Sequence, residues 1–135
     1  NFKKGAKNLL TYLQKEGVPI ALATSSVESR ARMILDSNGI LSLFDHLVFA
    51  KDVKRSKPYP DIFLKACSDL NVLPENCLVL EDSEAGIEAA SRAGIPVICI
   101  PDLKIPAQSF LNKTEQVFQD LDAVRDYLES KKEVF

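Results

Sequence analysis

Hydrophobic and polar positions alternate along the chain in two patterns, one with the period of an α-helix and one in short apolar runs. Apolar residues spaced three and four positions apart begin at Ala6 and end before Gly17, which predicts a helix. The run Val18 to Ala23 follows directly and predicts a buried strand. The alternation then repeats, with helices expected at 27–37, 60–70, 87–93 and 121–128 and strands at 47–49, 77–80, 95–100 and, weakly, 116–118.

Strands that alternate with helices predict an α/β fold whose sheet is mostly parallel. No stretch of residues 1–135 has the composition of a linker or a low-complexity segment, so we expect a single domain. In sheets of this kind, ligands bind beyond the carboxyl ends of the strands. The polar residues that follow the expected strands are therefore the candidates for chemistry.

Composition narrows the class of protein. The chain has 135 residues, of which 46% are hydrophobic, and its formal net charge is -2. A chain of this length can bury its own core, and this charge gives no preference for nucleic acid or for a membrane. Three cysteines without a C-x-x-C pair are typical of buried, reduced thiols, so we expect a cytoplasmic protein. His46 is the only histidine, which argues against a zinc site.

Three hydroxyl residues, Thr24, Ser25 and Ser26, stand between the first expected strand and the helix that follows it. Hydroxyls and free backbone N–H groups at a helix N-terminus form an anion site. Ser and Thr are also the usual N-cap residues, so capping of the helix is the alternative interpretation. Both interpretations hold together if one residue caps the helix and the others bind the anion.

Two further polar groups follow later strands. Lys57 lies in the segment SKPYPD, where two prolines stiffen the backbone. A fixed ammonium can pair with a phosphate, although most loop lysines are solvated surface charges.

Glu81 and Asp82 follow the strand at 77–80, and adjacent carboxylates need a cation or hydrogen-bond donors. Magnesium is commonly held by such carboxylates together with a phosphate, whereas the alternative is that Asp82 or Ser83 caps the next helix.

Together these groups place a phosphate cradle, a fixed cation and an acid pair at one sheet edge, as phosphoryl transfer requires. The segments that carry them resemble motifs two, three and four of the haloacid dehalogenase-like hydrolases: IALATSS at 20–26, SKPYPDIF at 56–63 and LEDSEAGIEAA at 80–90. The closest resemblance is to the β-phosphoglucomutase-like branch, and it covers nearly the whole chain. It implies a Rossmann-like, three-layer core.

The resemblance also implies a role for each matched residue. Thr24 would bind the transferring phosphoryl group through its hydroxyl and Ser25 through its backbone N–H, while Ser26 would lie on the substrate side. Lys57 would neutralise the phosphoryl oxygens and orient the nucleophile. The metal ligands would be Asp82, which binds Mg²⁺ directly, and Glu81, which binds it or holds its waters.

The first motif of the family has no counterpart in this sequence. That motif is an apolar strand ending in Asp-x-Asp, and its first Asp is the nucleophile. The only Asp-x-Asp here is Asp120-Leu121-Asp122, and its place before the last helix is typical of an N-cap. The resemblance implies that the missing strand and a helical cap domain precede this segment. The strand would lie between those ending in Ala23 and Leu80. Without it these two strands would be about 10 Å apart, twice the spacing of about 5 Å between paired strands, and would have unpaired edges.

We therefore expect residues 1–135 to be incomplete without the missing amino-terminal segment, to fold poorly alone and to be inactive alone. The intact protein is expected to be a magnesium-dependent phosphatase of a small phosphorylated metabolite, such as a sugar phosphate, with an aspartyl-phosphate intermediate. One alternative is a phosphomutase of the β-phosphoglucomutase type, and another is a shortened, non-catalytic module that binds phosphate or a protein. A receiver domain is disfavoured, because its acid pair should precede Lys57.

Overall fold

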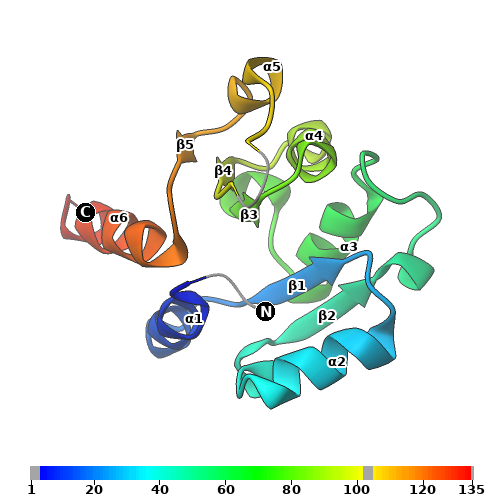
Figure 1. Ribbon diagram of the computed structural model, residues 1–135, viewed down its shortest axis with the longest axis horizontal. Helices are drawn as coiled ribbons and strands as arrows, with labels where there is room; N and C mark the ends of the chain where they lie inside the picture. Colours follow the sequence, from blue (N-terminus) through cyan, green and yellow to red (C-terminus); the bar gives the residue numbers. More distant parts are fainter. Residues whose placement is uncertain (1–3, 102–104, 135) are drawn as a thin grey trace.

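The computed structural model describes residues 4–101 and 105–134, in which helices alternate with short strands (Figure 1). None of the described helices combines the length and the apolar composition that crossing a membrane requires. The helices are α1 Ala6–Lys15, α2 Glu28–Ser37, α3 Asp61–Leu70, α4 Glu84–Ala93, α5 Gln108–Leu111 and α6 Leu121–Val134. The strands are β1 Ala21–Thr24, β2 His46–Phe49, β3 Val79–Glu81, β4 Val97–Cys99 and β5 Gln116–Val117, and the 3-10 turns are η1 Leu41–Leu43, η2 Ala50–Asp52 and η3 Pro74–Asn76.

The strands form two parallel sheets rather than one. β1 pairs with β2 in a register that places Ala21 opposite His46 and Thr24 opposite Phe49. The other sheet has the order β3, β4, β5. In the part of the chain that the structure describes, no strand joins β1 to β3, and Figure 1 shows the break between them. The break falls where the sequence analysis expects the missing strand.

Apolar clusters cover both faces of the three-stranded sheet. Val97 and Cys99 of β4 belong to a cluster with residues of α3 and α4. Ile98, between them in the chain, belongs to a second cluster with residues of α1 and α6. Because successive residues of a strand point to opposite faces, β4 lies between two layers of helices. This arrangement confirms the predicted three-layer α/β fold with parallel strands.

The helix ends follow from residues that the sequence pattern marks. Gly39 and Gly94 have φ angles of 70° and 74°, a left-handed conformation that glycine adopts at little cost and that ends α2 and α4. Pro60 occupies the N-cap of α3 with a φ of -79°, so it stands one position outside the helix. Gly39 and Gly94 thus stop the helices that precede β2 and β4, and Pro60 marks where the loop after β2 gives way to α3.

The prediction of a buried strand at Val18–Ala23 is wrong in two respects. The strand β1 begins only at Ala21, and all four of its residues are half-buried. All three residues of β4, in contrast, are buried. The difference follows from position, because β4 has a paired strand on each side and β1 has a paired strand on one side only.

Two smaller differences separate the structure from the sequence predictions, and one prediction lies partly outside the described residues. The helix α5 has only four residues, too few for a periodic signal, and the sequence analysis missed it. Cys77 is half-buried, although Cys67 and Cys99 are buried as expected. The sequence also predicts a loop at Pro101–Pro106, and that prediction falls partly on residues 102–104, which lie outside the described residues.

Candidate active site

The hydroxyl residues after β1 form a turn that leads into α2. The Ser26 backbone N–H donates a hydrogen bond to Thr24 Oγ1 at 3.1 Å. Thr24 is half-buried, while Ser25 and Ser26 are exposed. The N-cap residue of α2 is Val27, which provides no side-chain hydrogen bond to the helix. The capping interpretation is therefore wrong for these three residues, which remain candidates for binding an anion.

Lys57, in the loop before α3, forms an ion pair with Glu81 at the end of β3. The distance from Lys57 Nζ to Glu81 Oε2 is 2.9 Å, and the two side chains are only 15% and 10% exposed. The Lys57 ammonium also lies 5.0 Å from the centre of the Phe63 ring, within the range of a cation–π interaction. The alternative interpretation of Lys57 as a solvated surface charge is therefore wrong.

The second carboxylate oxygen of Glu81 is held by the loop that follows β3. Glu81 Oε1 accepts hydrogen bonds from the backbone N–H groups of Asp82 and Ser83 at 3.0 and 3.2 Å, and from the Ser83 hydroxyl at 3.1 Å. Burial opposes the ionisation of Glu81, but attraction to Lys57 and hydrogen bonds with Lys57 and Asp82 outweigh it and lower the pKa of Glu81. Glu81 is thus an ionised carboxylate in a fixed position.

Helix α4 begins directly against the Glu81 side chain. Ser83 is the N-cap residue, and its hydroxyl accepts a hydrogen bond from the Gly86 N–H at 3.1 Å. A Cβ atom at Gly86 would overlap with the Glu81 side chain, so a residue without a side chain is required there. The fourth motif segment therefore positions Glu81 in two ways. Ser83 caps α4 beside it, and the backbone at Gly86 lies directly against its side chain.

Asp82 completes the acid pair. It is not the helix cap, because Ser83 takes that role, and its hydrogen bonding to Glu81 contributes to the lowered pKa of Glu81. Carboxylate oxygens suit Mg²⁺, which usually completes its shell with waters and substrate phosphates. Within residues 4–101 and 105–134, no three side chains of His, Cys, Asp or Glu gather as a metal site. The acid pair fits part of a magnesium shell and requires further oxygen ligands.

The Asp120-Leu121-Asp122 segment does not resemble a nucleophile site. The Asp120 carboxylate accepts a hydrogen bond from the Ala123 N–H at 2.9 Å, three residues along the chain, as an N-cap does. The Leu121 N–H donates to the Lys4 carbonyl oxygen at 3.1 Å. This geometry confirms the N-cap interpretation made from the sequence.

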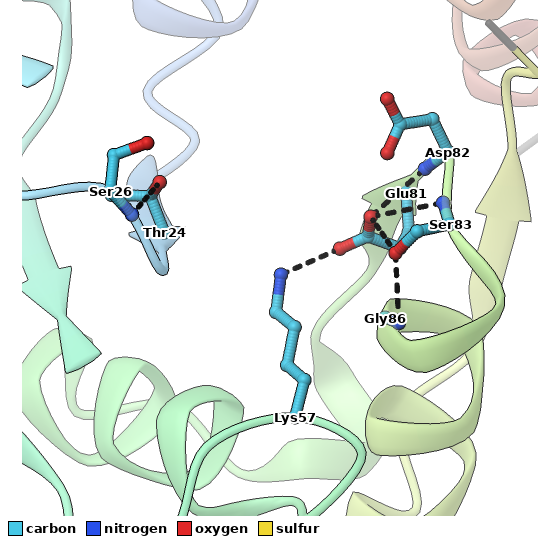
Figure 2. A network of polar contacts seen from close by, with 7 residues as sticks. All are labelled: Thr24, Ser26, Lys57, Glu81, Asp82, Ser83 and Gly86. Carbon is cyan, nitrogen blue, oxygen red and sulfur yellow. Dashed lines mark hydrogen bonds and ion pairs between the residues drawn. The ribbon is translucent and has the colours of Figure 1, made fainter. Parts of the chain in front are cut away.

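Figure 2 shows how the candidate residues lie relative to one another. Lys57 stands between the turn at Thr24 and Ser26 and the acid pair Glu81 and Asp82. Lys57, Glu81 and Asp82 form one polar network, whereas Thr24 and Ser26 bond to each other on the β1 side of the sheet break. The structure thus connects Lys57 directly to the acid pair. The hydroxyl turn at Thr24 and Ser26 lies across the sheet break from them.

Two residues that hold this network have no functional signal in the sequence pattern. Phe63 packs its ring under the Lys57 ammonium, but in the sequence it is indistinguishable from a core residue of α3. The sequence predicts Ser83 only as a helix cap, and its hydrogen bond to Glu81 has no local sequence signal. Both roles depend on how α3 and α4 pack, which motif spacing does not reveal.

Known proteins similar to this chain are named as phosphatases or as a phosphomutase. A validoxylamine A 7′-phosphate phosphatase of Streptomyces hygroscopicus subsp. limoneus is 40% identical over 121 residues, covering 90% of this chain and 56% of that protein. A bifunctional riboflavin kinase/FMN phosphatase of Arabidopsis thaliana is 39% identical over 125 residues, covering 90% of this chain and 32% of that protein. The crystal structure of a β-phosphoglucomutase from Clostridium difficile has a TM-score of 0.82 and 29% identity, covering 96% of this chain and 56% of that one. The chain thus spans about half the length of these proteins, or less.

A family-level match agrees with the site. The sequence profile of the haloacid dehalogenase-like hydrolases matches residues 1–100. That range includes the turn at Thr24, the loop with Lys57 and the acid pair Glu81 and Asp82. The order of these groups, the parallel strands that carry them and the profile match lead to one conclusion: the chain belongs to the haloacid dehalogenase-like hydrolase family.

Proposed function

We propose that the intact protein is a magnesium-dependent phosphatase of a small phosphorylated metabolite. The observation that carries this proposal is the largely buried Lys57–Glu81 ion pair, with Asp82 beside it and the hydroxyl turn opposite. A cluster of this kind can position a phosphoryl group and offset its charge, which is most of what phosphoryl transfer requires. Support also comes from the relatives of Streptomyces and Arabidopsis, whose names describe phosphatases of phosphorylated small molecules.

Each group has a distinct task in the proposed reaction. The Thr24 hydroxyl and the backbone N–H of Ser25 would bind phosphoryl oxygens at the start of α2. The Lys57 ammonium, held in place by Glu81, would pair with those oxygens as their charge develops. Asp82 and Glu81 would hold Mg²⁺, which when bound offsets negative charge on the phosphoryl group.

The proposed nucleophile comes from a strand that lies between β1 and β3. Among the residues that the structure describes, both strands have an unpaired edge at this break, and the motif order of the family places an aspartate there. The aspartate would attack the phosphorus atom, and the substrate oxygen would leave and take up a proton. Water would then hydrolyse the aspartyl phosphate and release inorganic phosphate. The missing amino-terminal segment is therefore the proposed partner of this chain.

The test is an assay of phosphate release by the full-length protein, with Mg²⁺ and a panel of sugar and nucleotide phosphates. Lys57→Met and Asp82→Asn should each lower kcat/KM by about 100-fold or more. Lys54→Met and Asp36→Asn are matched controls, because both side chains are exposed and lie outside the network. Wild-type kcat/KM in a folded double variant of Lys57 and Asp82 would refute the site, and circular dichroism would establish that the variant is folded.

Phosphomutase activity is the second candidate, because the fold closely matches the β-phosphoglucomutase of Clostridium difficile. A mutase returns the phosphoryl group to the sugar, whereas a phosphatase releases it to water. Phosphorus NMR of the full-length protein with a hexose 1-phosphate and a catalytic amount of a hexose bisphosphate separates the two. Conversion to a hexose 6-phosphate without free phosphate would favour the mutase.

A further inference from the structure

Two cysteines that the proposed function does not use are in contact, one in α3 and the other just before β3. The sulfur atoms of Cys67, in α3, and Cys77, just before β3, are 3.2 Å apart. The Cys67 thiol donates to the Cys77 sulfur, and the Cys77 thiol donates to the Leu73 carbonyl oxygen at 3.4 Å. A disulfide bond requires about 2.05 Å between sulfurs, so closing the pair needs a movement of roughly 1 Å.

The two thiols differ in exposure. Cys67 is 5% exposed and Cys77 is half-buried, so a reagent from solvent meets Cys77 first. Burial and the hydrogen bond to Cys77 raise the pKa of Cys67 to about 12, so its thiol stays protonated at neutral pH. The third cysteine, Cys99, is fully buried in β4. The geometry therefore gives Cys77 the role of the first thiol to react and Cys67 that of the second.

We propose that Cys67 and Cys77 form a reversible disulfide when the protein meets a low-molecular-weight disulfide such as oxidised glutathione. The Cys77 thiol first loses its proton to solvent, and its sulfur attacks one sulfur of the reagent, so that the reagent S–S bond breaks and one glutathione thiolate leaves. Cys67 then loses its proton and attacks the Cys77 sulfur, which expels the second glutathione thiolate. Two protein thiols are oxidised, and one reagent disulfide is reduced to two thiols.

The disulfide connects elements that carry the candidate site. α3 begins just after the Lys57 loop, and β3 ends at Glu81, so a bond from Cys67 to Cys77 links the supports of both partners of the ion pair. The bond also closes a loop in the unfolded chain and thereby lowers its entropy. In the cytoplasm, where we propose that the protein resides, disulfides of this kind are usually transient and redox-sensing. The oxidised protein should be the more stable form.

The experiment uses the full-length protein and oxidised glutathione as the probe. After incubation, the sample is quenched in acid, alkylated in denaturant with iodoacetamide and analysed as peptides by mass spectrometry. We expect the Cys67 and Cys77 peptides to be joined and two hydrogens lighter than the free thiols, with Cys99 alkylated. The melting temperature should rise by several degrees and return to its starting value after a reductant is added.

Single variants assign the steps. Cys67→Ala should accumulate glutathione on Cys77, Cys77→Ala should leave Cys67 unmodified, and Cys99→Ala should behave as the wild type. Two results with the wild-type protein overturn the proposal without reference to any variant. One is recovery of both Cys67 and Cys77 as alkylated thiols, and the other is a persistent glutathione adduct on Cys77. Neither result would affect the proposed phosphatase, which uses none of the three cysteines.

Discussion

Lys57 and Glu81 are separated by 24 positions in the chain, yet their charged atoms meet at 2.9 Å in a largely buried ion pair. Glu81 also binds its own loop, so the lysine is held by an anchored partner. A cation that is already positioned loses little freedom when a substrate phosphate arrives, and it needs no solvent rearrangement. The ion pair therefore explains how a loop lysine could bind phosphate at a precise place in the proposed reaction.

Removing one partner of this pair should destabilise the full-length protein. We expect Glu81→Gln to lower the free energy of unfolding by about 3 kcal/mol, because it leaves the Lys57 charge buried without its counter-ion. The double variant Glu81→Gln with Lys57→Met should lose less than the sum of the two single changes. Urea denaturation measures all four proteins. Strict additivity would contradict a direct interaction between the two side chains.

The lowered pKa of Glu81 predicts a dependence of stability on pH. A carboxyl whose pKa is lower in the folded state stabilises the fold above its unfolded pKa, about 4.3 for Glu, and loses that contribution as the pH falls through the folded pKa. The difference in unfolding free energy between wild type and Glu81→Gln should therefore be constant near neutral pH and shrink in acid.

Urea denaturation at a series of pH values, with a chelator present, tests this expectation. The pKa values of Glu28 and Glu88 are lowered too, by hydrogen bonds with Lys51 and Lys113, so the wild type alone would report several groups. Taking the difference from Glu81→Gln removes their shared contribution. A difference that grows as the pH falls would contradict the assigned direction.

The close approach of Gly86 to Glu81 gives a third prediction. Gly86→Ala should lower stability by about 1–3 kcal/mol and also lower activity, because the new Cβ displaces the Glu81 carboxylate. The matched control places the same change in a Glu81→Ala background, where the overlapping side chain is gone. There, alanine should be neutral or stabilise α4 by up to about 1 kcal/mol. An equal loss in both backgrounds would assign the effect to something other than Glu81.

Ser83 both caps α4 and binds Glu81, so Ser83→Ala should have two effects. The loss of the cap should cost about 1 kcal/mol of stability. Loss of the hydroxyl donor should raise the pKa of Glu81, which would move the acid loss of stability to higher pH. Ser91→Ala, an exposed serine in the same helix, is the control and should change neither quantity.

Residues 1–135 expressed alone should lack a cooperative thermal transition. Within residues 4–101 and 105–134, both β1 and β3 have an edge without a paired strand, and such edges lower stability and promote association. Circular dichroism during heating, with sedimentation to detect association, measures this. A sharp melt of a monomer with native-like sheet content would show that the break costs less than we infer.

The sequence predicts the carboxyl ends of β1 and β3 to within one residue, and with them the places of Thr24 and Glu81. Hydrophobic periodicity marks where a buried strand stops, and polar residues at that point fall at the sheet edge. The sequence could not predict that Lys57 and Glu81 bind each other. It places each residue within its own motif, whereas their contact depends on the packing of α3 beside the strands.

The hydrophobic pattern also could not predict that β1 is only half-buried. An apolar run such as IALA at 20–23 indicates a strand made for burial, and it says nothing about which neighbours are present. The break between β1 and β3 was instead expected from the resemblance, through the absence of a motif. The hydrophobic pattern therefore predicts the helices and strands, whereas the break between β1 and β3 follows from the absence of the first motif.

The break between the two sheets also makes this chain suited to fragment complementation. A single strand entering between β1 and β3 would pair along both of its edges at once, so its two rows of hydrogen bonds form together. A peptide that carried the proposed catalytic aspartate on such a strand should restore the sheet and the proposed activity in one association event. The proposed phosphatase activity would then be a direct signal that two pieces of the protein, expressed separately, have associated.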